Sequence, residues 1–150
     1  MNIPLVAVGG IILREDKILL IKRGHEPNKG MWAVPGGKVK FGESIEQAVK
    51  REVSEETNLN VKIEKLAAIV EAVRENYHYV IFDYVSSVVN GEASASSDAK
   101  EVRFFPLSEA IRLPMTPTMY PLIKALIEKV KFPIVVRDLY GSVVSYPLIS

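Results

Sequence analysis

One predicted helix carries acidic side chains on the same arc as its apolar side chains. Ser44 followed by Gln47 forms the S-x-x-Q pattern of a capping box, so the helix is predicted to begin at Ser44. At about 100° per residue, its apolar residues form one stripe, and Glu52 and Glu56 fall within the same arc. The stripe consists of Ile45, Ala48, Val49 and Val53. This helix must therefore pack on a core while two of its carboxylates meet a cation.

The acidic side of this helix indicates a divalent-metal site. Glu55 lies at the edge of the stripe, and the spacing predicts that Glu52, Glu55 and Glu56 converge. Arg51 can pair with one glutamate through a bidentate fork, but one guanidinium does not neutralise three carboxylates. Mg²⁺ prefers oxygen ligands and is commonly held by one or two carboxylates plus a substrate phosphate. A glutamate-rich helix is more often a solvated surface, but the position of the acids within the apolar arc favours the metal site.

The chain turns just before this helix. By itself, Pro35-Gly36-Gly37 is most simply a turn, because proline fixes φ and glycine tolerates positive φ. Its place ahead of the acidic helix favours a functional loop.

Residues 37–59, GKVKFGESIEQAVKREVSEETNL, resemble the Nudix box of the Nudix hydrolases. The motif departs from the family at Asn58, where glycine is usual. Asparagine also tolerates the left-handed conformation that closes a helix, so little strain is expected there. The matching positions are Gly37, Glu43, Arg51, Glu52, Val53, Glu55, Glu56 and Leu59.

The resemblance covers about residues 5–131 and implies an α/β fold class, the Nudix fold, with a mixed curved β-sheet between helices in α/β/α layers. The chain has 150 residues, 48% of them hydrophobic, which predicts a single domain over residues 1–150. Residues 132–150 form a C-terminal extension with the pattern of a hairpin around Tyr140-Gly141-Ser142. We expect this tail to pack on the domain or on a second copy in a homodimer.

Local patterns predict the remaining elements. The segment 24–30 is expected to be a loop, and Gly91–Asp98 a mobile loop. Strands are predicted at 5–13, 18–21, 31–34, 61–73, 78–88 and 101–105, a helical turn at 108–112, and a helix from Thr116 or Thr118 to Lys131.

The resemblance also implies roles in the site. Glu52 and Glu56 would bind Mg²⁺ directly, with Mn²⁺ as a substitute. Glu55 would bind it directly or through water, and the Gly37 carbonyl would be a further ligand. Arg51 would orient a glutamate, and Glu43 would secure the loop against the helix.

Three acidic residues are candidates for the general base. Some family members use a glutamate of the box, and others use an acid from a downstream loop. Glu52 is the first choice, and Glu101 and Asp98 are the loop candidates.

The implied reaction is hydrolysis of the pyrophosphate bond in a nucleoside diphosphate linked to another moiety. Residues 78–84 resemble the ADP-ribose pyrophosphatase branch, although the chain has no proline between Pro35 and Pro106. Dinucleoside polyphosphates and oxidised nucleoside triphosphates stay open as substrates. A non-catalytic nucleotide-binding regulatory module is an alternative of another class.

Several residues outside the box are candidates for substrate binding. Trp32, Tyr77 and Tyr79 offer aromatic platforms for a base, and Arg23 offers a cation for phosphate, but each also fits a structural role. Asp83 fits contact with a base or sugar, or, more commonly, a salt-bridged structural acid.

The composition of the chain limits the classes of molecule that it is expected to bind. A net charge of +1 and a pI of about 7.9 do not favour duplex nucleic acid or an anionic membrane, so a small nucleotide is the expected partner. The chain has no cysteine, which excludes thiol catalysis. The apolar run near the N-terminus is too short to cross a bilayer, and the resemblance implies a cytoplasmic enzyme.

Overall fold

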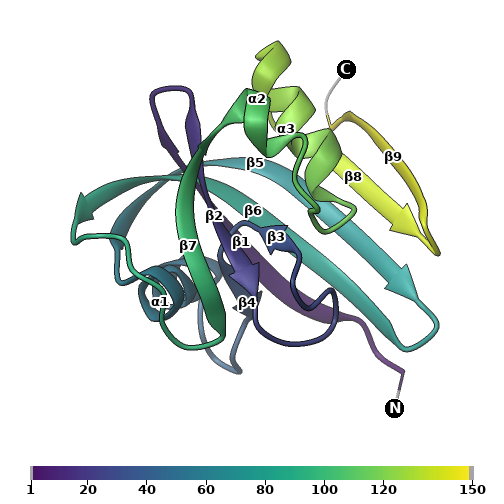
Figure 1. The fold of residues 1–150 in the computed structure, drawn as a ribbon. Coiled ribbons are helices and arrows are strands. Elements are labelled where there is room, and N and C mark those ends of the chain that lie inside the picture. Colours follow the sequence, from purple (N-terminus) through teal and green to yellow (C-terminus); the bar gives the residue numbers. More distant parts are fainter. Residues whose placement is uncertain (1, 149–150) are drawn as a thin grey trace.

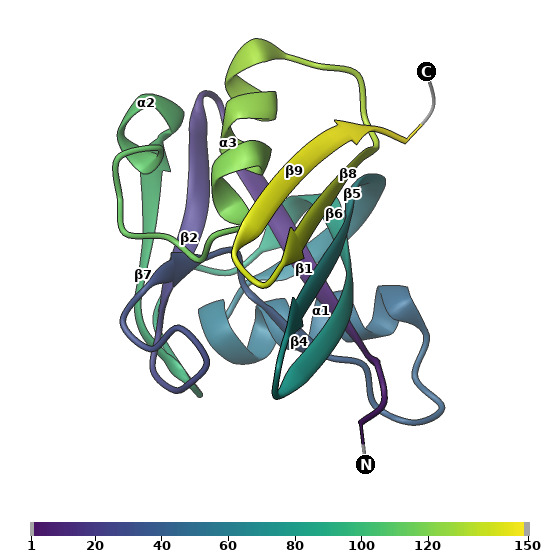
Figure 2. The same cartoon turned by 90° about the vertical axis from the view of Figure 1, so that its right-hand side faces the viewer.

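The computed structural model describes residues 2–148, and its central element is a mixed β-sheet with helices on both faces (Figure 1). The strands are β1 (Leu5–Arg14), β2 (Lys17–Arg23), β3 (Trp32–Ala33), β4 (Gly36–Lys38), β5 (Asn60–Arg74), β6 (Tyr77–Asn90), β7 (Ala99–Pro106), β8 (Ile134–Leu139) and β9 (Ser142–Pro147). The helices are α1 (Ile45–Thr57), α2 (Leu107–Ala110) and α3 (Met119–Glu128). The expected layers are confirmed, since α1 and α3 lie on opposite faces of the sheet (Figure 2).

The sheet runs in the order β3-β2-β1-β6-β5-β8-β9, with β4 on β1 and β7 on β2. The β1–β6 and β5–β8 pairs are parallel, and the other pairs are antiparallel. The long β5–β6 ladder changes register at three places, Asn60/Val61, Ile63/Lys65 and Leu66/Ala68. Such irregularities bend and twist a strand, and they give the sheet its curvature.

Successive side chains of each strand point to opposite faces of the sheet, so the core consists of two clusters, one on each face. In β1, Val8 and Ile12 pack against α1, whereas Ile11 packs on the face that α3 covers. Val49 and Val53 of α1 and Leu122 and Ile123 of α3 are almost fully buried. Burial of these side chains fixes which face of each helix is turned to the sheet.

Helix α1 begins and ends as its sequence predicts. Ser44 is the N-cap, and its hydroxyl accepts a hydrogen bond from the Gln47 amide while the Gln47 side chain accepts one from the Ser44 amide. Asn58 closes the helix in the left-handed region, with φ 62° and ψ 21°. Both ends of the acidic helix are therefore fixed by local sequence.

Helix α3 is shorter than predicted. It ends at Glu128 rather than Lys131, because Lys129 turns into the left-handed region with φ 54° and its amide returns to the carbonyls of Ala125 and Leu126. Pro133 follows closely, and the residue before a proline disfavours helical backbone. No helix within residues 2–148 has the length and apolarity that crossing a bilayer requires.

The segment between β6 and β7 has no regular structure, as expected, but it is tied to the end of α1. The Ser94 amide donates to the Thr57 carbonyl, and the Ser96 amide donates to the Glu56 carbonyl. These bonds hold the loop beside the acidic helix, and its predicted mobility stays a prediction.

The tail forms the predicted hairpin and extends the sheet. Strand β8 runs parallel to β5, and Ile134, Val135 and Val136 are buried. Asp138 of β8 accepts two hydrogen bonds from Arg74, at 2.7 and 2.8 Å. Residues 149 and 150 lie outside the described residues.

We predict that the tail contributes to the stability of the domain. Val136→Ala should lower the free energy of unfolding by about 2 kcal/mol, because Val136 is fully buried between β5 and α3. The matched control is Val144→Ala in β9, where the side chain is 51% exposed, and it should change stability by less than about 0.5 kcal/mol. Urea denaturation measures both variants, and equal small losses would show that the tail does not support the core.

Candidate active site

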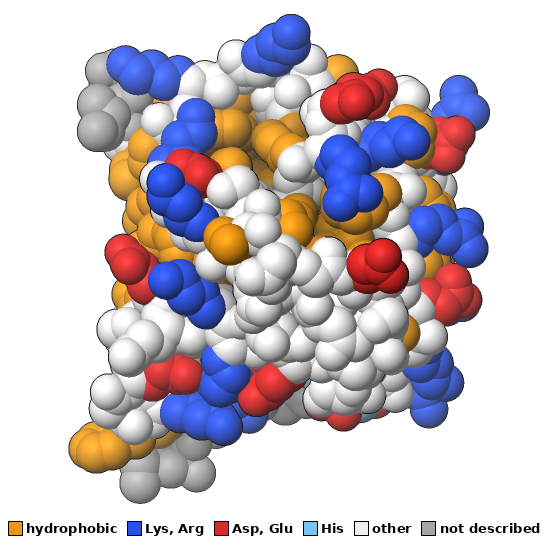
Figure 3. Space-filling model, turned by 90° about the vertical axis from the view of Figure 1, so that its left-hand side faces the viewer, with side chains coloured by type: hydrophobic (Ala, Val, Ile, Leu, Met, Phe, Trp, Pro, Cys, Tyr) orange, Lys and Arg blue, Asp and Glu red, His pale blue; other side chains and the backbone are white. Residues whose placement is uncertain are grey.

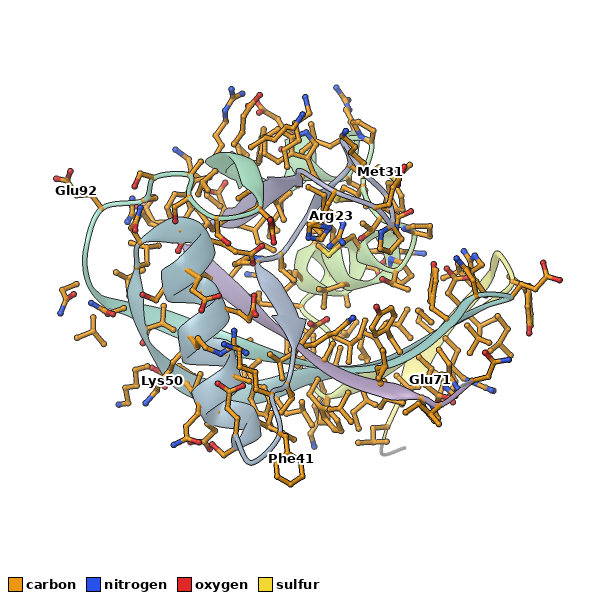
Figure 4. The ribbon with its side chains drawn as sticks, turned by 90° about the horizontal axis from the view of Figure 1, so that it is seen from below. Arg23, Met31, Phe41, Lys50, Glu71 and Glu92 are labelled. Atoms are coloured by element: carbon orange, nitrogen blue, oxygen red, sulfur yellow. The ribbon has the colours of Figure 1, made fainter. Side chains whose placement is uncertain are left out.

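A cavity of about 510 Å³ lies between the sheet and the segments that precede β3 and α3. Gly36, Gly37, Glu52 and Glu56 line one end, so the acidic helix and strand β4 share this space. Alternate residues of β6 line another wall: Tyr77, Tyr79, Ile81 and Asp83. In Figure 4, Arg23 lies near the centre of the molecule, whereas Lys50 and Phe41 lie toward its outer edge.

Arg51 joins the loop before α1 to the acidic side of the helix. Its Nε and Nη2 donate to the Glu43 carboxylate at 2.7 and 2.9 Å, and Nη1 donates to Glu52 at 2.6 Å. Nη2 also donates to the Lys38 carbonyl at 3.0 Å. The hydrogen bonds from Arg51 and then from the Lys40 amide lower the pKa of Glu43 to about 2. Glu43 is thus a fixed anion that positions Arg51.

Glu55 lies outside this arrangement. Its carboxylate is 3.4 Å from Nη1 of Arg51, and its side chain is half-exposed. Unlike Glu52, it is not among the residues that line the cavity. A role for Glu55 in metal binding stays a prediction.

Glu56 is a buried acid with one hydrogen-bond partner in the described part of the chain. It is 7% exposed, and its Oε1 accepts from the Gly36 amide at 2.7 Å. Burial raises the pKa of Glu56 to about 8, and the negative charge of Glu52 acts in the same direction. No arginine or lysine side chain within residues 2–148 bonds to Glu56, and Arg23 lowers its pKa only through a longer-range charge effect, so the ionised form of Glu56 would be stabilised by a further cation.

The predicted turn at Pro35-Gly36-Gly37 is wrong: Gly36 and Gly37 begin strand β4, which pairs antiparallel with β1. These glycines allow the backbone to approach the two acids. A Cβ on Gly37 would lie 2.6 Å from the carboxyl group of Glu52, so this carboxylate would have to move away from the position in which Arg51 holds it. Glycine at position 37 therefore leaves Glu52 in place beside the cavity.

The oxygen ligands at the site fit a hard divalent cation, but the structure brings together fewer carboxylates than the sequence predicts. The expectation that three carboxylates converge is wrong: within residues 2–148, no three acidic or imidazole side chains form a metal-holding group. Arg51 draws Glu52 and Glu55 to itself, and Glu56 turns to the Gly36 amide. Two carboxylates and a backbone carbonyl at position 37 remain beside the cavity. This set suits a cation that keeps several waters and shares a substrate phosphate.

The two downstream acids separate in the structure. Asp98 lines the cavity, and its Oδ2 lies 3.3 Å from Nε2 of His25. Glu101 does not line the cavity and instead lies 4.0 Å from Lys22. Asp98 is thus the downstream acid with access to a ligand.

Of the four substrate-binding candidates, three line the cavity. Arg23, Tyr77 and Tyr79 do so, with the two tyrosine rings 5.4 Å apart between centroids. Trp32 does not: it is 7% exposed and packs edge-on against Phe105 at 4.9 Å. The pairing of β3 with β2 directs the Trp32 side chain into the core. Its sequence position just before Gly36 and Gly37 did not predict this burial.

Asp83 differs from its sequence-based interpretation. It is 5% exposed, it lines the cavity, and within residues 2–148 it has no hydrogen bond or ion pair, so the salt-bridged structural acid is wrong. Burial raises the pKa of Asp83 to about 7. Its neighbour in β1 is Gly9, where any Cβ would collide with the carboxyl group of Asp83. An acid in an apolar strand was the available sequence signal.

We predict that Asp83 makes stability depend on pH. Its pKa rises from 3.8 in the unfolded chain to about 7 in the folded chain, so ionisation favours unfolding as pH rises through this window. Relative to Asp83→Asn, the wild-type free energy of unfolding should fall by up to about 4 kcal/mol between pH 4 and 7 and stay level above that. Denaturation of both proteins at several pH values measures the difference, and a difference independent of pH would contradict this assignment.

Comparison with known proteins places this geometry in a family. The family model for the NUDIX domain matches residues 4–126. The ADP-ribose pyrophosphatase of Methanocaldococcus jannaschii is 43% identical over 112 residues, which cover 73% of this chain and 66% of that relative. The chain therefore spans slightly less than two thirds of this relative.

Solved structures agree with this match. The MutT NUDIX hydrolase from Burkholderia pseudomallei is 30% identical with a TM-score of 0.74, covering 87% of this chain and 100% of that one. The bifunctional NMN adenylyltransferase/ADP ribose pyrophosphatase from Francisella tularensis, complexed with AMP and a Mn ion, is 25% identical with a TM-score of 0.68. That alignment covers 86% of this chain and 42% of the bifunctional protein. Fold, box and family model together show that the chain belongs to the NUDIX family.

Proposed function

We propose that this chain hydrolyses the pyrophosphate bond of a nucleoside diphosphate linked to another moiety, with ADP-ribose as the favoured substrate. The observation that carries the proposal is one cavity with Glu52, Glu56 and Gly37 at one end and two tyrosines along its wall. Family membership and the similarity to the M. jannaschii ADP-ribose pyrophosphatase and the F. tularensis bifunctional protein support the same reaction.

The proposed cofactor is Mg²⁺, with Mn²⁺ as a substitute. NUDIX hydrolases generally need divalent metal ions, and a Mn ion is named in the F. tularensis complex. Glu52, Glu56 and the Gly37 carbonyl would hold the cation, with Glu55 reaching it through water. When bound, the cation neutralises charge on the phosphates and lowers the pKa of a bound water.

The side chains of the chain supply the remaining chemistry. Arg51, fixed by Glu43, orients Glu52 toward the cavity. Glu52 takes the proton of the attacking water as general base. Asp98 is the second candidate for this role because it lines the cavity. Glu101 ranks below both, since it lies outside the cavity.

The walls of the cavity match the two ends of a nucleotide. Arg23 supplies a cation for phosphate, and its Nε donates to the Pro27 carbonyl at 2.7 Å, which holds the side chain in place. Tyr77 and Tyr79 supply an aromatic platform for a base. Dinucleoside polyphosphates and oxidised nucleoside triphosphates present the same groups and are the alternative substrates.

The proposal includes a cytoplasmic location, a homodimer, and no binding to duplex nucleic acid or membrane. On the face shown in Figure 3, lysine and arginine side chains are interspersed with acidic ones, with no broad cationic surface there. The net charge of +1 agrees with this distribution.

The first prediction of this proposal concerns the two cavity glutamates. Glu52→Gln and Glu56→Gln should each lower kcat/KM for ADP-ribose by about two to four orders of magnitude, because each removes a metal ligand or the base. Glu46→Gln is the matched control on the exposed first turn of α1, and it should keep wild-type activity. Steady-state kinetics with Mg²⁺ measures all three, and near-normal activity in the first two would refute their roles.

The second prediction concerns substrate and metal. With Mg²⁺, the chain should cleave ADP-ribose to AMP and ribose 5-phosphate faster than it cleaves diadenosine polyphosphates or deoxynucleoside triphosphates. EDTA should abolish turnover, and added Mg²⁺ should restore it. Chromatography of the products measures each rate. Binding of these ligands without cleavage of any would favour the non-catalytic regulatory module.

A further inference from the structure

Asp83 is a buried acid that the proposed hydrolysis leaves without a role. Its neighbours in register are Gly9 of β1 and Ala68 of β5, neither of which carries a polar side chain. Within residues 2–148 it has no hydrogen-bonding partner, yet it lines the cavity. A buried carboxyl group without a partner is costly, so a group that enters the cavity is the natural partner.

Strand register places Asp83 between the two ends of the cavity. Gly36, whose amide bonds to Glu56, pairs with Gly9, and Gly9 pairs with Asp83. Two strand separations put Asp83 about 10 Å from Gly36 in β4. In the other direction, Tyr79 lies four residues along β6 on the same face, about 13 Å away. Asp83 thus lies beyond the phosphate end and before the aromatic platform.

The sugar of a nucleotide occupies this intermediate position, because ribose joins the phosphate to the base. Phosphate itself is anionic and is repelled by a carboxylate. The hydroxyl groups of ribose are hydrogen-bond donors, and an acidic side chain accepts from them in other nucleotide-binding folds. The raised pKa of Asp83 agrees with this role, since both its neutral and its ionised form accept a hydrogen bond from a hydroxyl group.

We propose that Asp83 accepts a hydrogen bond from the 2′-hydroxyl group of the substrate's nucleoside and makes the enzyme selective for ribonucleosides over 2′-deoxyribonucleosides. Gly9 is part of this subsite, because a side chain there would occupy the position of the Asp83 carboxyl group. This inference rests on the proposed function, since it assumes that the phosphates lie beside Glu52 and Glu56.

The test compares ADP-ribose with its analogue that lacks the 2′-hydroxyl group on the adenosine side. The wild type should prefer ADP-ribose by about 10- to 100-fold in kcat/KM, the range expected for one hydrogen bond to a charged group. Asp83→Ala should bring this ratio close to one, mainly by slowing the cleavage of ADP-ribose. Asp83→Asn keeps an acceptor and should retain part of the preference, and it replaces the alanine variant if that one does not fold. Ser86→Ala is the control, a buried polar residue of the same strand that does not line the cavity.

A wild type that cleaves both compounds equally would overturn the proposal, as would an Asp83→Ala variant that slows both by the same factor. Calorimetric binding of AMP and of 2′-deoxy-AMP separates this inference from the proposed function. If the wild type binds AMP more tightly and Asp83→Ala removes the difference, the sugar subsite stands even where hydrolysis fails. Equal binding of the two nucleotides by the wild type would reject the subsite whatever the enzyme hydrolyses.

Discussion

The hydrogen bonds of Arg51 fix the arrangement on which the rest of the site depends. One guanidinium connects Glu43 and the Lys38 carbonyl, which belong to the segment before α1, with Glu52 on the helix itself. Its planar fork makes these bonds in fixed directions, which a lysine does not reproduce. Strand β4, the loop and the helix therefore hold one position relative to one another. Glu52 is directed to the cavity as a consequence.

Arg51 also leaves one acid of the site without a direct cationic partner. Its donors are used by Glu43, Glu52 and Glu55, whereas the hydrogen bond that Glu56 accepts within residues 2–148 comes from the Gly36 amide. Burial raises the pKa of Glu56 to about 8, although the charge of Arg23 acts in the opposite direction. A divalent cation at this end of the cavity would stabilise the ionised form, and a pyrophosphate would then complete its ligands. The same protein scaffold thus provides a place for metal and a place for substrate.

Local patterns in the sequence predicted most elements of the fold, but they did not predict strand β4, whose glycines indicated a turn. The capping box of α1, the left-handed Asn58 and the hairpin of the tail depend on neighbouring residues, and all three are confirmed. The end of α3 depends on Lys129 and on the approach to Pro133, for which the apolar periodicity carried no signal. The site was less accessible to such reasoning. The helical phase correctly placed Glu52 and Glu56 on one side of the helix. It did not predict that Arg51 would bond to Glu52 and Glu55 while Glu56 bonds to the Gly36 amide.

Tertiary pairing decided the residues that sequence patterns left open. Trp32 and Tyr79 are both aromatic residues of predicted strands. The β2–β3 pairing buries Trp32, whereas Tyr79 lies on the face of β6 that lines the cavity. Asp83 became informative only when the β1–β6 register placed Gly9 beside it. These relations join residues far apart in the chain, so no local pattern encodes them.

The proposed site requires that Glu52 and Glu56 together hold a divalent cation at the end of the cavity. Electron paramagnetic resonance of free Mn²⁺, titrated with protein, measures this binding directly without any turnover. We predict that the wild type and Glu46→Gln bind Mn²⁺ alike, and that Glu52→Gln and Glu56→Gln each weaken binding by about tenfold or more. Unchanged Mn²⁺ affinity in both of these variants would show that the two glutamates do not hold the cation.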